Sequence, residues 1–298
     1  MTRKVATFSG RVVRDELRRL AQRDNTQAVT DRFDASQNAL HEAVLRVAGR
    51  STQPVDVRKA RELQSQYARA QRNVALAVSR DINTLLGETR NDSLGLARRL
   101  VSRFTSTLDD ERVARRVSEA NDQLGQRGLS QLLAKWHTET QAKIKAAGAQ
   151  ALRDELSPAE FVSRLREVAD GERWKLERII RTETSFAFNA VQEEAVVAIA
   201  EVHRDVMKRW TELVDDTTGQ PFDKRVGRDS IAMHGQVTRP GGVFTMPNDR
   251  RVDSKWWGRQ WSFPPNRPND RSVVIPWRPE FGVPAWICRS GTRTPYRG

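Results

Sequence analysis

The sequence has little cysteine, no long apolar run and, over its first two thirds, almost no proline. Cys288 is the only cysteine among 298 residues, so the chain can form no internal disulfide, which is typical of proteins in a reducing compartment. The longest apolar run, 195–200, has six residues, whereas a membrane span needs roughly 18, so we expect no membrane partner. The start of the chain is basic but has no apolar core, and we expect no secretory signal.

Acidic residues are fewer than basic ones, 38 against 51, which gives a formal net charge of +13. Basic chains attract polyanions, above all nucleic acid. The acidic residues are interspersed among the basic ones, however, and such mixing is also typical of solvated helix faces with no polyanion partner. Both interpretations stay open. From residue 206 on there are 16 basic and 9 acidic residues, so we expect any DNA contact in that part.

Proline divides the chain into two parts. Only Pro54 and Pro158 precede residue 221, and the other ten of the twelve prolines lie from Pro221 onward. Tryptophan has a similar bias, with five in the last 43 residues: Trp256, Trp257, Trp261, Trp277 and Trp286. Proline is poorly tolerated inside helices and central strands, so we expect the later part of the chain to consist of loops and short or edge strands.

The fold class that follows is mostly α, with long N-terminal helices followed by a small α+β module of short strands. We predict a helical arm or bundle over residues 1–156, the module over 157–285 and a tail over 286–298. The helices have thin apolar stripes, so they pack either against one another as a bundle or against a partner. The extended segments of the module are predicted at 235–237, 241–244 and 272–275.

Local signals place several helix boundaries. We expect breaks at 49–54, at 87–92 and near Asp109. Ser157 and Glu160, with a proline between them, predict a helix start with a capping box. Alternating four- and three-residue steps predict a coiled-coil-like seam at Leu63, Tyr67, Ala70, Val74 and Ala77.

One carboxylate lies on an apolar stripe. The stripe comprises Leu176, Ile180, Ala187, Val191, Ala195 and Ile199. Glu183 falls on it, where a charge is costly unless it is paired or hydrogen-bonded. Arg271 or a backbone amide of the C-terminal module is the expected partner. We interpret Glu183 as a buried tie between helix and module; the alternative is an acid in a catalytic pocket.

No known catalytic or cofactor motif is present. Asp215 and Asp216 are suited to a divalent ion, but Asp-Asp-Thr-Thr-Gly is also a common turn. The four histidines are scattered and have no cysteine neighbours, which disfavours zinc. The sequence has no P-loop, dinucleotide fingerprint or serine elbow. We therefore expect no cofactor, no metal and no catalytic residue.

Basic residues and tryptophans are mixed in one segment near the C-terminus. Its members are candidate DNA or partner contacts: Arg250, Arg251, Lys255, Trp256, Trp257 and Arg259. Such mixing suits stacking on single-stranded nucleic acid and suits a protein interface equally well.

Three blocks of residues, taken in order, resemble one known family. The first is Arg181-Thr182-Glu183-Thr184 with Asn189 and Gln192. The second is Trp210, Asp215-Asp216-Thr217-Thr218 and His234-Gly235-Gln236-Val237. The third is Pro264, Pro265, Pro268, Asn269 and Arg271 with the valine pair that follows. Over residues 160 to 278 the chain resembles the Mu F-like minor head proteins of tailed bacteriophages, also called head-morphogenesis proteins.

The chain departs from that family at its cysteines. Many members have a cysteine pair after the Asp-rich turn and a histidine with two cysteines in the closing segment. Here Gly219 and Phe222 fall near the first pair, and Arg267, Asp270 and Ser272 stand at the closing positions. The metal-tied form of the module is therefore not available, and we expect a salt-bridged substitute formed by Arg267, Asp270 and Arg271.

The resemblance implies an architectural role without catalysis. Such proteins associate with the portal protein inside the capsid, with the major capsid or scaffolding protein and packaged double-stranded DNA as further candidate partners. They act in head morphogenesis and in DNA packaging or ejection, and they occupy the host cytoplasm during assembly. Two alternatives stay open: a metal-dependent nuclease or toxin-like enzyme that uses His234 and Asp215, and a free DNA-binding protein. We expect no appended enzymatic domain within the 298 residues, since the helical region and the module account for their length.

Overall fold

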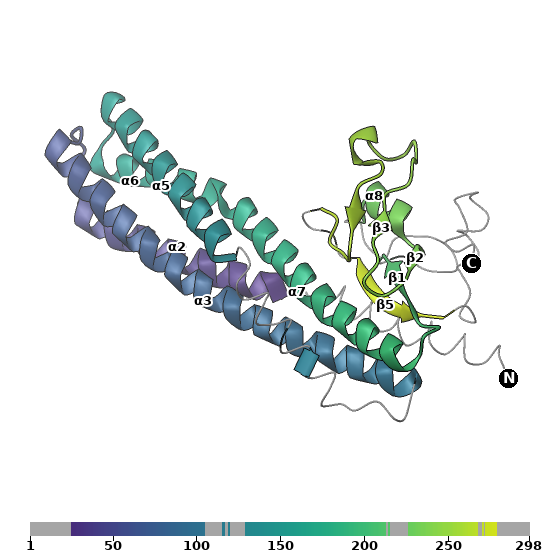
Figure 1. Cartoon of the computed structure of the whole chain (residues 1–298). Coiled ribbons are helices and arrows are strands. Elements are labelled where there is room, and N and C mark those ends of the chain that lie inside the picture. The colour runs from purple at the N-terminus through teal and green to yellow at the C-terminus, as the bar shows by residue number, and fades with distance from the viewer. Residues whose placement is uncertain are drawn as a thin grey trace. The chain divides into compact units, whose positions relative to one another are not determined.

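The structure is a computed structural model that describes residues 25–104, 115, 116, 119, 129–212, 214, 226–267, 270 and 272–278. The described long helices are α2 (Asn25–Ala48), α3 (Val57–Phe104), α5 (Leu129–Arg153), α6 (Pro158–Gly171) and α7 (Arg173–Val202). They are followed by β1 (Met207–Thr211), α8 (Arg228–Met233), β2 (Val237–Thr238), β3 (Phe244–Thr245), the 3-10 turn η1 (Ser254–Trp256), β4 (Gln260–Trp261) and β5 (Val273–Trp277) (Figure 1). The predicted fold class, long helices and then short strands, is confirmed.

The chain forms two compact units. The helical unit comprises residues 25–85 and 127–180, and the mixed unit comprises residues 1–24, 86–126 and 181–298. Because the boundaries fall within α3 and α7, each of these helices contributes residues to both units. The domain boundaries expected from the sequence, at 156/157 and 285/286, stay a prediction. No described helix has an uncharged apolar stretch long enough for a bilayer.

The helical unit packs α2, α5, α6 and the first parts of α3 and α7 around an apolar core. Phe33 and Trp136 meet edge to face, with ring centroids 6.1 Å apart. The buried stripe of α3 comprises Leu63, Tyr67, Gln71, Val74, Val78 and Ile82. The predicted seam is therefore right at three positions and wrong at Ala70 and Ala77, which are half-buried and exposed. A straight helix has 3.6 residues per turn, so its buried stripe drifts away from a strict 3.5-residue repeat.

A polar pair lies within this stripe. The Gln37 side chain of α2 donates to the Gln71 side chain of α3 over 2.9 Å, and both residues are almost fully buried. An amide buried in an apolar layer is stabilised only opposite a matching partner, so this pair favours one register of α2 against α3.

Of the predicted helix breaks, one is confirmed, one is wrong and one lies outside the described residues. The break at 49–54 is confirmed, since α2 ends at Ala48 and α3 begins at Val57. The break at 87–92 is wrong, because α3 continues through it. Leu86, Leu96 and Ala97 are buried on either side, and their burial outweighs the cost of about 1 kcal/mol for a glycine in a helix. The expected break near Asp109 lies outside the described residues.

The start of α6 is as predicted. The Ser157 hydroxyl accepts from the Glu160 backbone N–H, and the Glu160 carboxylate accepts from the Ser157 backbone N–H over 2.9 Å. This capping box satisfies two backbone donors that the first turn leaves without helical acceptors.

The mixed unit contains a three-stranded antiparallel sheet of order β2-β1-β5 and a two-stranded sheet of β3 and β4. All five residues of β1 and of β5 are buried. β5 is an edge strand, which explains why Pro276 is tolerated in it. A core cluster of Trp210, Met233, Phe244, Met246, Val252 and Val274 lies between the two sheets and α8.

Each predicted extended segment overlaps a strand: the segments at 235–237 and 241–244 share one residue each with β2 and β3, and the segment at 272–275 shares three with β5. The central strand β1 was not predicted. Its sequence, Met-Lys-Arg-Trp-Thr, has two adjacent cations, which normally indicate an exposed segment.

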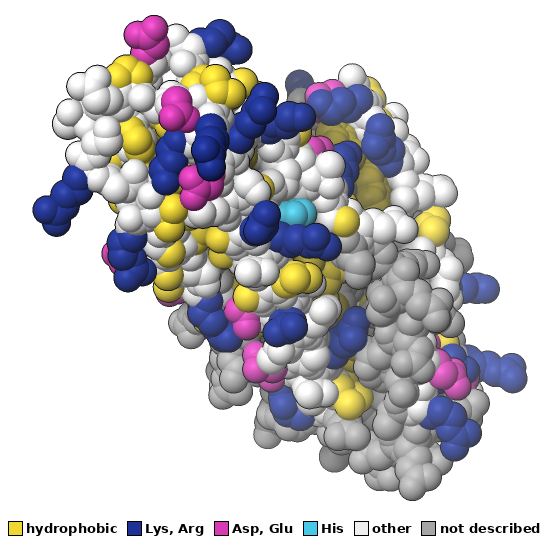
Figure 2. Space-filling model, turned by 90° about the vertical axis from the view of Figure 1, so that its left-hand side faces the viewer, with side chains coloured by type: hydrophobic (Ala, Val, Ile, Leu, Met, Phe, Trp, Pro, Cys, Tyr) yellow, Lys and Arg dark blue, Asp and Glu magenta, His cyan; other side chains and the backbone are white. Residues whose placement is uncertain are grey.

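Charged side chains of both signs are exposed on the described part of the chain. On the face drawn in Figure 2, Lys and Arg side chains predominate and Asp and Glu side chains lie among them. The interspersion expected from the sequence is therefore visible on the folded chain.

Candidate functional site

One turn of α7 joins three other elements of the mixed unit. Asn189, Gln192 and Glu193 lie within five residues of each other and are all buried. Each has a polar partner on a different element, as described below. A buried polar side chain is stable only when it is hydrogen-bonded, so this turn fixes how the elements pack on α7.

Asn189 attaches β5 to α7. Its Nδ2 donates to the Ser272 carbonyl over 2.9 Å, and its Oδ1 accepts from the Val274 N–H over 2.8 Å. Nδ2 also donates to the Ser185 carbonyl at 2.9 Å, which holds the side chain against its own helix. The amide thus binds two backbone groups at the start of β5, in the place that a neighbouring strand would otherwise take.

Gln192 faces the second part of α3. Its Nε2 donates to the Ser93 carbonyl over 2.8 Å and lies 2.9 Å from the Ser93 hydroxyl. The Ser93 hydroxyl in turn donates to the Phe188 carbonyl over 2.8 Å. Gln192 and Ser93 therefore link α7 to α3 through one small buried network.

Glu193 forms a buried ion pair with Lys208 of β1. Lys208 Nζ lies 2.6 Å from Glu193 Oε1 and donates to the Ser262 carbonyl, also over 2.6 Å. The ammonium lies 5.2 Å from the centre of the Phe244 ring. Burial raises the pKa of Glu193 and lowers the pKa of Lys208, and each partner opposes that shift in the other. Neither residue was identified from the sequence.

His234 is the centre of a second buried network. It is 4 % exposed, its Nδ1 accepts from the Glu212 N–H over 2.8 Å, and its Nε2 lies 3.2 Å from Arg209 Nη2. Gly235 follows with φ +84°, a value that favours glycine, and its N–H donates to the Trp210 carbonyl over 2.8 Å. The pair His234-Gly235 thus ends α8 against β1.

The segment that precedes β5, which we call the closing segment, joins this network through Asp270. The Asp270 carboxylate accepts from the backbone N–H groups of Asn266 and Ser272, over 2.8 and 3.0 Å, and from the Ser230 hydroxyl of α8. The Ser272 hydroxyl lies between Asp270 and Glu212, 2.7 and 2.9 Å from their oxygens. Asp270 and Ser272 therefore tie the closing segment to α8 and β1 by hydrogen bonds.

The expected salt-bridged substitute of Arg267, Asp270 and Arg271 lies only partly within the described residues. Arg267 pairs with Asp229 of α8, with Nε 2.8 Å from Oδ2, and the described partners of the Asp270 carboxylate are hydroxyl and backbone groups. Asp229 was not anticipated because it is 38 residues away in sequence. Arg271 and Pro268 lie outside the described residues, as do Asp215 and Asp216. Pro264 is buried and Pro265 half-buried, next to Asn266.

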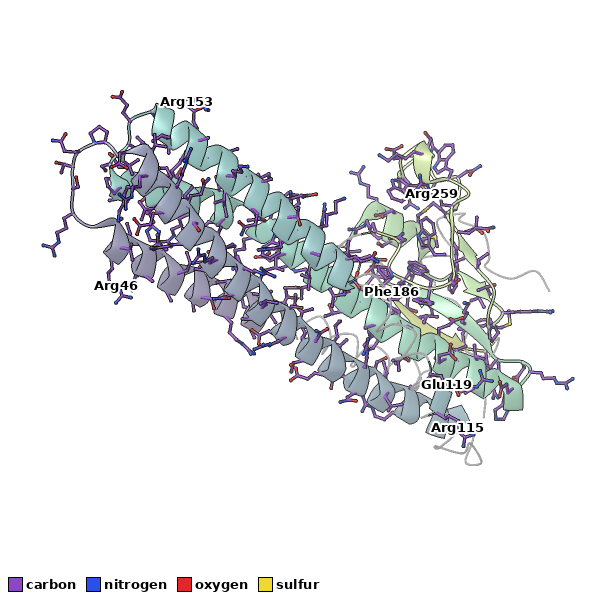
Figure 3. The ribbon with its side chains drawn as sticks, turned by 60° about the vertical axis from the view of Figure 1, so that its left-hand side comes forward. Arg46, Arg115, Glu119, Arg153, Phe186 and Arg259 are labelled. Atoms are coloured by element: carbon purple, nitrogen blue, oxygen red, sulfur yellow. The ribbon has the colours of Figure 1, made fainter. Side chains whose placement is uncertain are left out.

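The Arg-Thr-Glu-Thr stretch lies half-buried on α7. Arg181, Thr182 and Glu183 are all of intermediate exposure. Burial raises the pKa of the Glu183 carboxyl, whereas a close cation would lower it. The expected tie to Arg271 lies outside the described residues. Figure 3 shows Phe186, one turn further, on the side of α7 that faces the strands, and its ring centroid lies 5.2 Å from that of Phe263.

The Arg- and Trp-rich segment forms a lobe, residues 246–261, which we call the Trp–Arg lobe. Met246 is joined to the residues that follow the 3-10 turn η1: its N–H donates to the Arg259 carbonyl over 2.9 Å, and its carbonyl accepts from the Gly258 N–H over 3.0 Å. Trp257 is 38 % exposed, and Trp256 is half-buried. The charged members Arg250, Arg251, Lys255 and Arg259 are all exposed.

A cleft of about 640 Å³ lies at the C-terminal end of α7. Val206, Met207 and Trp277 contribute to its apolar floor, and Arg204 and Arg239 are exposed beside it. The described residues that line it include no histidine, serine or cysteine. Within the described part of the chain, no three His, Cys, Asp or Glu side chains are grouped as metal ligands.

Comparison with known proteins gives no relative. No protein-family model, no curated protein and no solved structure matches this chain. The function must therefore be inferred from the residues and their geometry.

Proposed function

We propose that this chain is a minor head protein of a tailed bacteriophage, associated with the portal inside the capsid and acting in head morphogenesis and DNA packaging or ejection. One observation carries the proposal: the three blocks that resemble the Mu F-like family, far apart in sequence, pack into one unit. Asn189 of the first block binds β5 at the end of the third. Trp210 of the second block pairs with Val274 in the sheet.

Residues of the second block also bind one another within the same unit. The Trp210 N–H donates to the Gln236 carbonyl over 2.9 Å, and the Gly235 N–H donates to the Trp210 carbonyl. Asn189, Gln192, Trp210, His234 and Gly235 thus each make a packing contact within the module. This use of the motif residues supports an architectural role rather than a catalytic one.

The nuclease alternative is less well supported. A histidine that acts as a general base must reach the proton that it removes. His234 is almost fully buried, and both of its ring nitrogens lie within hydrogen-bonding distance of described groups. The proposal therefore assigns His234 to the packing of α8 against β1.

Co-expression with the portal and major capsid subunits tests the proposal. Particles are purified by sedimentation, and their peptides are quantified by mass spectrometry. We expect the chain in particles at low copy number, and we expect it to be absent when the portal subunit is omitted. Recovery of the chain only in the unassembled fraction, with or without portal, would contradict the proposal and favour a free DNA-binding protein.

A matched variant makes the test specific. His234→Asn keeps a polar side chain, and metal-dependent nicking of plasmid DNA by this variant and by the wild type is measured in parallel. No nicking by either protein, together with portal-dependent incorporation, is the expected result. Nicking by the wild type that the variant loses would instead support the enzyme.

A further inference from the structure

The Trp–Arg lobe is the exposed feature that the architectural role does not yet use. It is anchored to the core of the mixed unit, since Met246 and Val252 belong to the core cluster that contains Trp210. Its chain is held by local bonds, including one from Trp257 Nε1 to the Asp249 carbonyl over 3.2 Å. A rigid, exposed segment loses little conformational entropy when it binds a partner.

The charges of the lobe are only partly balanced. It has four basic and two acidic side chains. Arg251 forms a two-pronged pair with Asp249, which lowers the pKa of that carboxyl, and Lys255 lies 2.8 Å from Asp253. Among the described residues, Arg250 and Arg259 have no carboxylate partner within salt-bridge distance. Two cations are therefore available for an acidic partner.

The aromatic rings of the lobe are arranged in a stack. The Arg259 guanidinium lies 4.7 Å from the centre of the Trp256 ring, and Trp256 stacks on Trp261 with centroids 6.3 Å apart. Figure 3 shows Arg259 in the lobe, away from α7. The stack holds Arg259 in place, while Trp257 is the most exposed ring of the lobe.

The arrangement fits a protein partner better than a nucleic acid. Trp256 already stacks with Trp261 and Arg259, so much of its ring is not free for a base. Asp253 is exposed, and its charge would repel phosphates. A tryptophan and arginines at the centre, with ion pairs of both signs around them, are instead typical of protein interfaces, where Trp and Arg dominate the binding energy.

We infer that the Trp–Arg lobe is the surface through which this chain binds the portal subunit, with Trp257 entering an apolar recess and Arg250 and Arg259 facing acidic side chains. The inference rests on the proposed function, because the portal is the partner named there. The partner surface is thereby defined by its chemistry: a folded, acidic surface with a recess for one indole ring.

Two substitutions and two matched controls test the lobe in the full chain. Trp257→Ala removes the exposed ring, and Arg250→Glu reverses an unpaired charge. Trp174→Ala removes another exposed tryptophan beside an arginine, since the Trp174 ring lies 5.1 Å from the Arg178 guanidinium of the helical unit. Arg58→Glu reverses an exposed arginine of the same unit.

Binding to purified portal assemblies is measured by biolayer interferometry at fixed salt. We expect Trp257→Ala and Arg250→Glu each to weaken binding at least tenfold, and both controls to bind like the wild type. Thermal unfolding of each variant verifies folding; Arg250 has no described hydrogen bond, so Arg250→Glu provides the test even if Trp257→Ala unfolds the lobe.

The outcomes separate the inference from the proposed function. Wild type that does not bind the portal at all contradicts both. Wild type that binds, together with lobe variants that bind equally well, overturns the inference and leaves the proposed function in place. Loss of duplex or single-strand DNA binding in the lobe variants, with portal binding unchanged, would make the lobe a nucleic-acid surface and would likewise overturn the inference.

Discussion

At the scale of single residues, Asn189 makes the strongest prediction. Asn189→Ala leaves the Ser272 carbonyl and the Val274 N–H buried without their partner, and each such loss costs about 1–3 kcal/mol. We expect the free energy of unfolding to fall by about 3 kcal/mol, as measured by urea denaturation. Asn38→Ala is the control: its hydrogen bond to Arg166 is exposed, and its loss should cost less than about 0.5 kcal/mol.

A second substitution at Asn189 separates the contributions of its two hydrogen bonds to β5. Asn189→Asp keeps the acceptor for the Val274 N–H but removes the donor to the Ser272 carbonyl. Its effect should be at least as large, because a carboxylate would also be brought close to a carbonyl oxygen. An Asn189→Ala variant as stable as the wild type would show that β5 is held by the sheet alone.

The pair Lys208–Glu193 predicts a non-additive double mutant. Lys208→Met leaves the buried Glu193 without its cation and should lower the free energy of unfolding by about 3–5 kcal/mol. Lys208→Met with Glu193→Gln removes both charges at similar volume and should recover most of that loss. Urea denaturation of the two single variants and the double variant gives the coupling energy. Additive effects would show that the two side chains act independently.

Glu183 makes the prediction that depends on pH. Burial raises the pKa of its carboxyl above the ordinary 4.5, so the folded state binds the proton more tightly than the unfolded state. The stability due to the protonated form is present below pH 4.5 and is lost as the pH rises through the folded pKa. Glu183→Gln should therefore melt at a higher temperature than the wild type at pH 7, and the difference should vanish at pH 4.

The control for Glu183 is Glu42→Gln, which changes an exposed glutamate of α2. It should melt like the wild type at both pH values. A lower melting temperature of Glu183→Gln at pH 7 would have the opposite sign, and it would indicate that a cation such as Arg271 outweighs the cost of burial.

At the scale of elements, the capping box of α6 allows a test of local structure. Ser157→Ala removes the side-chain acceptor of the first turn and should lower the free energy of unfolding by about 1 kcal/mol. Ser157→Asp keeps an acceptor at the same position and should recover most of the loss. Circular dichroism during urea unfolding measures both variants. A Ser157→Ala variant equal to the wild type would mean that packing alone fixes the start of α6.

Elements with a strong local signal could be predicted from the sequence, and those set by tertiary packing could not. The capping residues of α6, Ser157 and Glu160, lie three residues apart, and the valines of β5 are adjacent. Strand β1 has a buried lysine and arginine, and it can be recognised only when Glu193 and His234 are known to be close. Helix α3 continues past Gly87 because burial of its leucines outweighs the local preference.

The candidate site divides in the same way. Asn189 and His234 could be selected because they fall in blocks that resemble a family. Lys208, Glu193 and Asp229 belong to pairs whose members are 15 and 38 residues apart, and no periodicity links such residues. Buried polar pairs of this kind become visible only when the fold is known.

At the scale of the whole molecule, the net charge of +13 overstates the attraction for DNA. Some cations of the helical unit lie beside carboxylates, as in the pairs Arg32–Asp81, Lys59–Glu62, Arg164–Glu167, Arg166–Asp170 and Arg173–Asp34. The carboxylate of such a pair repels phosphates and reduces the number of counterions that binding releases.

The expected consequence is weak duplex binding with a shallow salt dependence. Fluorescence anisotropy with a labelled duplex at 50, 100 and 200 mM NaCl gives the slope of log K against log salt, which is about −0.9 for each phosphate neutralised. We expect a slope equivalent to fewer than about five phosphates, because Asp and Glu side chains lie among the Lys and Arg side chains on the face drawn in Figure 2. A slope near about −10 would instead require a continuous basic surface, and it would favour a free DNA-binding protein over a portal-associated one.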